Sequence, residues 1–140
     1  MTKNDNAALA RRIYELFSLG KHDEAIGYAT DDVELVLYPF GQTFHGKEGF
    51  AQFMSGFTTA FPDLSITVTN QVADDAGVAS EFTAVGTHTG VLTTPAGDVA
   101  PTGHRVEFVV CEVWTVRDGL LASLRNYQDA GAIMRQLGLA

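Results

Sequence analysis

The sequence predicts an α+β fold in which N-terminal helices pack against a curved antiparallel sheet around an apolar cavity. In the first half of the chain, up to Phe61, apolar residues recur at the spacing of amphipathic helices. From Leu64 onward they alternate with polar residues, as in half-buried strands, and a short helix follows the last strand. Helices segregated from a run of successive strands are typical of α+β folds.

Length and net charge limit the number of domains and the kinds of partner. A chain of 140 residues, 46% of them apolar and without repeat or linker, suits one domain, residues 1–140, with its own core. The formal net charge of −8 disfavours nucleic-acid and anionic-membrane partners, since both need a basic footprint. The sequence has no membrane-length apolar run, and MTKNDNAALARR lacks the apolar core of a secretory signal. We therefore expect a cytoplasmic location.

The first helix is predicted by four apolar residues that share one helical face. These are Leu9, Ile13, Leu16 and Phe17. Asn4 and Asp5 precede the stripe and are candidate caps, and Gly20 ends the helix. Tyr14 lies beside the stripe, where its hydroxyl could donate to a ligand carbonyl or could simply lie at the edge of the core.

Next we expect three elements: a short helix over Asp23–Ala29, a strand over Val33–Tyr38 and a loop over residues 39–47. The strongest amphipathic helix follows and is closed by Pro62. Its stripe consists of Phe50, Phe53, Met54, Phe57 and Phe61. Such a stripe is typical of a core-facing helix, of which only some rings reach a cavity.

Period-two alternation then predicts strands over Leu64–Ala73 and Val78–His88, joined by a turn at residues 74–77. Residues 93–103 contain two prolines and are expected to form a long loop, which could close over the cavity. The strands Glu107–Val116 and Leu120–Tyr127 complete the sheet.

The last two strands should form a hairpin around Arg117-Asp118-Gly119. If the turn is centred near Gly119, Glu112 falls opposite Asn126 and Trp114 falls opposite Leu124. Side chains directly opposite one another point to the same face of a sheet. One carboxylate and one carboxamide then share an otherwise apolar face with Phe108, Val110 and Trp114. They form either a functional site or a structural hydrogen-bonded pair.

Glu112 is the leading candidate for a general acid or base. A carboxyl among apolar side chains is desolvated, which raises its pKa towards the range needed for proton transfer at a carbon next to a carbonyl. The alternative is that Glu112 only accepts hydrogen bonds from Asn126 or Arg125. Asn126 could likewise hold a substrate carbonyl or enolate oxygen, or could only satisfy Glu112.

His88 is the second candidate for proton transfer. It alternates with Phe82, Ala84 and Gly86, so its ring is expected to face the cavity, and its chemistry suits neutral pH. A structural histidine is the alternative. The residues expected to line the ligand are Tyr14, Phe40, Phe57, Phe61 and Trp114.

Two residues beside these candidates are expected to be structural. Cys111 faces away from Glu112 and is predicted to fill the core; as the lone cysteine it excludes an internal disulfide. Asp129 has the opposite parity to Asn126 and directly precedes the helix Ala130–Leu137, so it is predicted to cap that helix.

No metal or cofactor is expected. The four histidines, at positions 22, 45, 88 and 104, show no paired ligand spacing on one element. Gly86-Thr87-His88-Thr89-Gly90 lacks the lysine and the strand-to-helix context of a phosphate-binding loop.

Five short motifs carry a resemblance to a known family. They are Phe44-His45-Gly46-Lys47-Glu48-Gly49, Phe61-Pro62-Asp63-Leu64, Gly86-Thr87-His88-Thr89-Gly90, Pro101-Thr102-Gly103 and Gln136-Leu137-Gly138-Leu139. With this order of elements, the chain resembles the SnoaL-like polyketide cyclases and their ester-cyclase relatives, within the nuclear transport factor 2-like superfamily. The resemblance covers the chain from about residue 5 onward. It implies an α+β cone, a cofactor-free site at the bottom of the cone, and a homodimer packed through the sheets.

The chain departs from the cyclases it resembles at both polar centres. In those enzymes an Asp on the last strand acts as acid and base in an intramolecular aldol closure, and a His on the neighbouring strand assists. These positions fall at Asn126 and Glu112, so the carboxylate has moved across the hairpin. Proteins similar to limonene epoxide hydrolase carry Asp at the position of Asn126, and those similar to ketosteroid isomerase carry their base where this chain has Tyr38. Neither chemistry transfers directly.

Three functions remain open from the sequence. The first is a cofactor-independent cyclase or isomerase, in which Glu112 moves a proton on a small hydrophobic carbonyl compound. His88 would assist, and Asn126 and Tyr14 would steady the oxyanion. The second is a small-molecule-binding protein without catalysis. The third is a hydrolase that uses a water held by Glu112 and Asn126.

Overall fold

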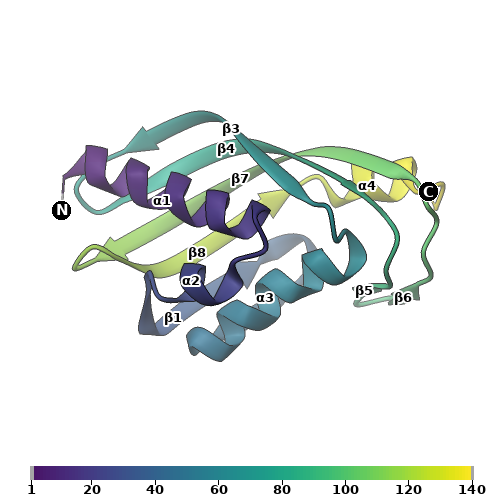
Figure 1. The fold of residues 1–140 in the computed structure, drawn as a ribbon, viewed down its shortest axis with the longest axis horizontal. Helices are drawn as coiled ribbons and strands as arrows, with labels where there is room; N and C mark the ends of the chain where they lie inside the picture. The colour runs from purple at the N-terminus through teal and green to yellow at the C-terminus, as the bar shows by residue number, and fades with distance from the viewer. Residues whose placement is uncertain (1, 140) are drawn as a thin grey trace.

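The computed structural model describes residues 2–139 and shows three helices packed on one face of a curved sheet, with a fourth beside its last strand (Figure 1). The helices are α1 (Lys3–Ser18), α2 (His22–Ile26), α3 (Gly46–Ala60) and α4 (Ala130–Gln136), with a 3-10 turn over Tyr38–Phe40. The strands are β1 (Ala29–Leu37), β2 (Gln42–His45), β3 (Ser65–Ala73), β4 (Gly77–Thr87), β5 (Leu92–Thr94), β6 (Gly97–Val99), β7 (Arg105–Arg117) and β8 (Leu120–Gln128). The predicted α+β class is confirmed.

The main sheet has six strands in the order β2-β1-β8-β7-β4-β3. Four of its five neighbouring pairs are antiparallel, as predicted, whereas β1 runs parallel to β8, with Leu35 beside Leu124. Helix α1 packs over β3 and β4, and α3 packs over β1, so the two helices cover the same face from opposite sides (Figure 1). This leaves the centre of that face, formed by β7 and β8, for a pocket.

The apolar stripes of the first and third helices are buried, as predicted. The α1 residues Leu9, Ile13, Leu16 and Phe17 are all in the core. In α3, Phe50, Phe53 and Met54 are buried, whereas Phe57 is only half-buried. Aromatic side chains of α3 therefore form much of the wall that faces the sheet.

The start of α1 differs from the prediction. Asn4 and Asp5 were expected as caps, but the N-cap is Thr2, one residue before the helix. The Thr2 hydroxyl accepts from the Asp5 backbone N–H, and the Asp5 carboxylate accepts from the Thr2 backbone N–H. This is a capping box, in which the acidic residue lies three positions after the cap.

Three further boundaries are corrected by the structure. Helix α2 ends at Ile26, because Ala29 already belongs to β1. The expected loop 39–47 contains β2, which pairs back onto β1 after a tight turn at Gly41, whose φ of 63° suits glycine. The expected loop 93–103 contains most of the small β5–β6 hairpin. Strands of three or four residues are too short for alternation to reveal.

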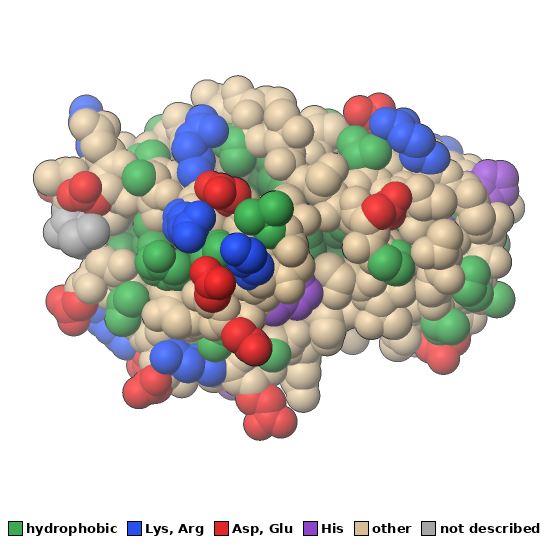
Figure 2. All heavy atoms as spheres, viewed as in Figure 1, with side chains coloured by type: hydrophobic (Ala, Val, Ile, Leu, Met, Phe, Trp, Pro, Cys, Tyr) green, Lys and Arg blue, Asp and Glu red, His purple; other side chains and the backbone are tan. Residues whose placement is uncertain are grey.

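Charges on the helix-covered face are mixed. Figure 2 shows lysine and arginine side chains lying among aspartate and glutamate side chains on this face, without a separate basic patch. Within the described part of the chain, no helix combines the length and the apolar character that a membrane span requires.

We predict that Gly77→Ala strongly destabilises the fold. A Cβ atom on Gly77 would lie 1.9 Å from the backbone oxygen of Trp114, where β4 and β7 begin to pair. The strands must then separate, and we expect a loss of about 1–3 kcal/mol in the free energy of unfolding, measured by denaturant titration.

Gly56→Ala is the matched control, because a Cβ on this α3 residue meets open space. Alanine in a helix interior should leave stability unchanged or raise it by up to about 1 kcal/mol. Equal stability of the two variants would contradict the close approach of β4 to β7.

Candidate active site

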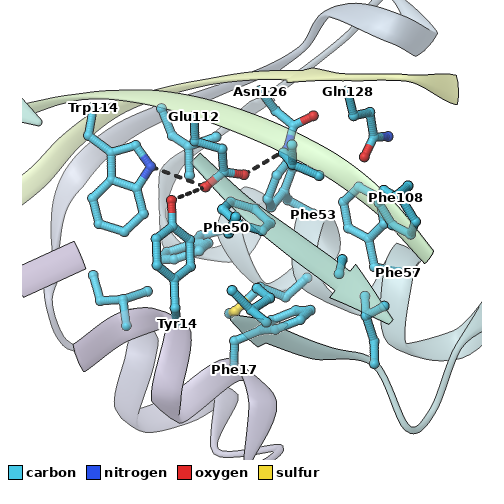
Figure 3. A pocket seen from close by; sticks show the side chains of 18 residues that line it. Tyr14, Phe17, Phe50, Phe53, Phe57, Phe108, Glu112, Trp114, Asn126 and Gln128 are labelled. Atoms are coloured by element: carbon cyan, nitrogen blue, oxygen red, sulfur yellow. Dashed lines mark hydrogen bonds between the residues drawn. The ribbon is translucent and has the colours of Figure 1, made fainter. Parts of the chain in front are cut away.

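An apolar pocket lies between the sheet and helices α1 and α3 (Figure 3). Its walls are mainly apolar and include the rings of Phe17 from α1, Phe50, Phe53 and Phe57 from α3, and Phe108 from β7. The free volume inside is small, about 50 Å³. Only a few polar side chains interrupt the walls, and most of them gather around one carboxyl group.

That carboxyl group belongs to Glu112, which is 4% exposed. Its Oε1 accepts hydrogen bonds from the Tyr14 hydroxyl at 2.8 Å and from the Trp114 indole N–H at 3.2 Å. Its Oε2 accepts from the Asn126 amide at 2.7 Å. Figure 3 shows the three donors converging on the carboxyl from α1, β7 and β8. We call these four residues the Glu112 cluster.

The β7–β8 register explains how three members of the Glu112 cluster meet. Glu112 pairs with Asn126 and Trp114 pairs with Leu124, as predicted from a turn near Gly119. Residues 112 and 114 lie on the same face because side chains alternate along a strand. Arg125, the other possible donor, pairs with Val113 and so lies on the opposite face.

Tyr14 joins the cluster from the first helix. Its ring packs against those of Phe82 and Trp114, with ring centroids 4.8 and 5.2 Å away. This aromatic packing holds the ring, and the hydroxyl points at the carboxyl. Tyr14 was expected either to donate to a ligand carbonyl or to lie at the edge of the core, and in the structure it is buried and its hydroxyl donates to Glu112.

Burial raises the pKa of Glu112 above its ordinary value, because desolvation disfavours the charged form. The hydrogen bonds from Asn126, Tyr14 and Trp114 favour the carboxylate and oppose this effect only in part. Burial and the neighbouring carboxyl raise the pKa of Tyr14 far above its ordinary value, so it remains a neutral donor. The three donors are thus all neutral.

His88 is not brought to this pocket. The predicted alternation holds, since His88 is buried like Phe82, Ala84 and Gly86 before it, but its position lies further along the sheet than the residues that line the pocket. The His88 ring is fully buried against Phe61 at 5.5 Å. Its Nδ1 accepts from the Thr102 backbone N–H at 3.2 Å, which anchors the segment before β7. Within the described residues, the expected partnership of His88 with Glu112 is therefore absent.

The expected ligand-lining residues divide into two groups. Tyr14, Phe57 and Trp114 line the pocket. Phe61 is buried but packs on His88 instead, and Phe40 lines a separate surface groove between the 3-10 turn, the β5–β6 hairpin and α4. Both exceptions lie at the end of an element, shortly before the chain enters β2 or β3.

Gln128 was missed by the sequence analysis and lines the pocket. It lies two residues after Asn126 on β8, so the same alternation that placed Asn126 would have found it. The cap predicted at Asp129 is confirmed, since its carboxylate accepts from the Ala132 backbone N–H at 2.9 Å. Cys111 faces away from the pocket as predicted, but it is only half-buried.

No three His, Cys, Asp or Glu side chains between residues 2 and 139 lie close enough together to hold a metal ion. The polar groups of the pocket are one carboxyl, a phenol, an indole and two amides. This set can hold a proton on Glu112 and can hydrogen-bond an oxygen of a ligand.

Residues 7–137 match the family described as SnoaL-like polyketide cyclase. The chain belongs to this family. The match covers nearly the whole chain, including all members of the Glu112 cluster. No curated protein matches the chain.

Solved structures share the fold of this SnoaL-like protein. A candidate SnoaL-like polyketide cyclase from Jannaschia sp. CCS1 is 20% identical, with a TM-score of 0.86, over 99% of this chain and 95% of that one. AclR, a candidate hydroxylase from Streptomyces galilaeus, is 22% identical, with a TM-score of 0.84, over 99% of this chain and 88% of AclR. IdmH, a candidate polyketide cyclase from Streptomyces antibioticus, is 25% identical, with a TM-score of 0.77, over 95% of this chain and 98% of IdmH. These similarities confirm the predicted nuclear transport factor 2-like fold.

We predict that Tyr14→Phe raises the pKa of Glu112 further, because a hydrogen bond that favours the carboxylate is lost. Carboxyl-carbon NMR titration measures this directly. The variant should also lose about 1–3 kcal/mol of unfolding free energy at a pH where Glu112 is ionised. Tyr127→Phe, on the outer face of β8 and 44% exposed, is the control. An unchanged Glu112 titration in Tyr14→Phe would contradict the assigned hydrogen bond.

Glu112 also makes stability depend on pH. Because folding raises its pKa, the folded state holds the proton more tightly than the unfolded chain, and this stabilisation is lost as pH rises from the ordinary value of 4.5 through the folded-state pKa. Compared with Glu112→Gln, the wild type should lose unfolding free energy over that window. Glu107→Gln removes an exposed carboxyl from the same strand and serves as the control. A wild-type protein that instead gains stability relative to Glu112→Gln would reverse the assigned shift.

Proposed function

We propose that this protein is a cofactor-independent cyclase or isomerase that transfers a proton at a carbon next to a carbonyl in a small, largely hydrophobic, polyketide-like compound. The observation that carries the proposal is the buried Glu112 carboxyl in an apolar pocket. Burial raises its pKa, and a base for a carbon acid works best when its pKa lies near the operating pH. Membership of the SnoaL-like polyketide cyclase family supports this class of reaction.

The hydrogen bonds of Glu112 leave room for the substrate proton. A carboxylate has about four acceptor positions, two on each oxygen. The Tyr14 hydroxyl and the Trp114 N–H occupy both positions on Oε1, whereas Asn126 occupies one on Oε2. The second position on Oε2 is free within the Glu112 cluster. We assign proton abstraction to this oxygen.

The same neutral donors can serve both states of the reaction. Before transfer, Tyr14 and Asn126 stabilise the ionised carboxyl. Once Glu112 has taken the proton, its oxygens accept more weakly, and the negative charge resides on the enolate oxygen of the substrate. Donors that favoured the base can then favour the enolate, as preorganised dipoles do in other enzymes. His88 has no part in this step, because its ring is held outside the pocket.

The size of the pocket limits the reaction. Pockets for small molecules commonly measure about 300–1,000 Å³, well above the 50 Å³ found here. A substrate must therefore displace side chains of the wall. In the wall, Phe53 and Phe57 are best suited to move, because Phe57 is only half-buried and so is Phe44, which packs edge-to-face against Phe53 outside the pocket lining.

A binding protein without catalysis is the second candidate. It is favoured by the amide at position 126, which cannot exchange a proton in the working pH range. In that case the Glu112 cluster would only orient a ligand.

The test is hydrogen–deuterium exchange at the carbons next to the carbonyls of 2-heptanone and 2,6-heptanedione, followed by NMR. The wild type should accelerate exchange, with a rate that rises with pH through the pKa of Glu112. Glu112→Gln should reduce the acceleration at least about 100-fold, since it removes the base.

Glu107→Gln is the control and should exchange like the wild type, because its carboxyl is on the outer face. Exchange that survives Glu112→Gln would rule out Glu112 as the base. Binding of both ketones without accelerated exchange would favour the second candidate.

A further inference from the structure

The pocket contains a polar side chain that the proposed proton transfer does not use. Gln128 lines the pocket wall near Phe57 and Phe108, one strand repeat beyond Asn126 of the Glu112 cluster (Figure 3). Its Nε2 is buried and has no hydrogen-bond partner among residues 2–139. A buried donor without a partner destabilises a fold by about 1–3 kcal/mol. An apolar residue of similar size would avoid this cost if only packing were needed.

The position of Gln128 relative to Glu112 follows from the strands. Gln128 pairs with Val110, and Asn126 pairs with Glu112, so the two amides lie two residues apart on the same face of β8. At the rise of an extended strand this is about 7 Å. The pocket therefore has polar groups at two points along β8, within otherwise apolar walls.

We propose that Gln128 is a specificity-determining residue that donates a hydrogen bond to a second oxygen of the substrate, remote from the carbonyl that reacts at Glu112. This rests on the proposed function only for the identity of the reacting carbonyl. The ligand class is a compound with two oxygens on one apolar chain, about one strand repeat apart. A 1,5-diketone has this pattern, whereas a monoketone of the same length lacks the second oxygen.

The chemistry of an amide suits this role. A carboxamide carries both a donor and an acceptor, so rotation of the Gln128 side chain can meet either a carbonyl or a hydroxyl oxygen. A site built to hydrogen-bond a substrate oxygen discriminates against the analogue that lacks it, because its own buried group is then left unpaired. Gln128 would thereby fix which carbon of the chain lies at Oε2 of Glu112.

The experiment compares the affinities of 2-heptanone and 2,6-heptanedione by NMR titration. The wild type should bind the diketone about tenfold more tightly, which is the effect of one buried hydrogen bond. Gln128→Leu should lose this preference by weakening diketone binding alone. Gln52 is an exposed glutamine of α3, so the control variant Gln52→Leu should retain the preference for the diketone.

A second measurement does not depend on the folding of Gln128→Leu. In the wild type, the side-chain amide resonances of Gln128 should shift when the diketone is added and should stay unmoved with 2-heptanone. Equal affinity for the two ketones, including no binding of either at millimolar concentration, would overturn the proposal. A diketone preference that persists in Gln128→Leu would also overturn it.

The inference and the proposed function fail separately. Glu112→Gln should keep the affinity difference between the two ketones while it loses hydrogen–deuterium exchange. A preference for the diketone without exchange in the wild type would support Gln128 and contradict proton transfer by Glu112. Exchange without the preference would support Glu112 and contradict the role of Gln128.

Discussion

The site depends on the burial of one carboxyl group among neutral donors. The carboxyl of Glu112 receives three hydrogen bonds, and the residues that supply them carry no positive charge. An arginine in their place would hold the carboxylate ionised, and a wholly apolar pocket would hold the acid protonated. Hydrogen bonds to neutral groups leave the two protonation states closer in free energy. The other features of the pocket serve to keep those donors in place and water away.

Much of this arrangement could be predicted from the sequence, since it depends on local rules. The position of Gly119 sets the hairpin turn, the turn sets the register, and the register places Asn126 opposite Glu112. Alternation then puts Trp114 on the same face. The cap at Asp129 likewise requires only the residue type and the helix that follows.

The rest depended on contacts that sequence spacing does not encode. The hydrogen bond from Tyr14 joins residues 98 positions apart, so only the packing of α1 on the sheet reveals it. His88 was misplaced because alternation gives the face of a residue but not how far along the sheet a pocket extends, and its ring is buried against Phe61 outside the pocket. Gln128 was overlooked because its strand continues one residue beyond Tyr127.

The parallel pairing of β1 with β8 has a consequence for how the chain folds. Leu35 lies beside Leu124 in the finished sheet, although most of the chain separates them. During synthesis, β1 emerges long before its neighbour and must wait with one edge unpaired until β8 has been made. Contacts between such distant residues close large loops and slow folding. The polar pocket therefore cannot be complete before β8 has been synthesised, because Asn126 and Gln128 lie on that strand.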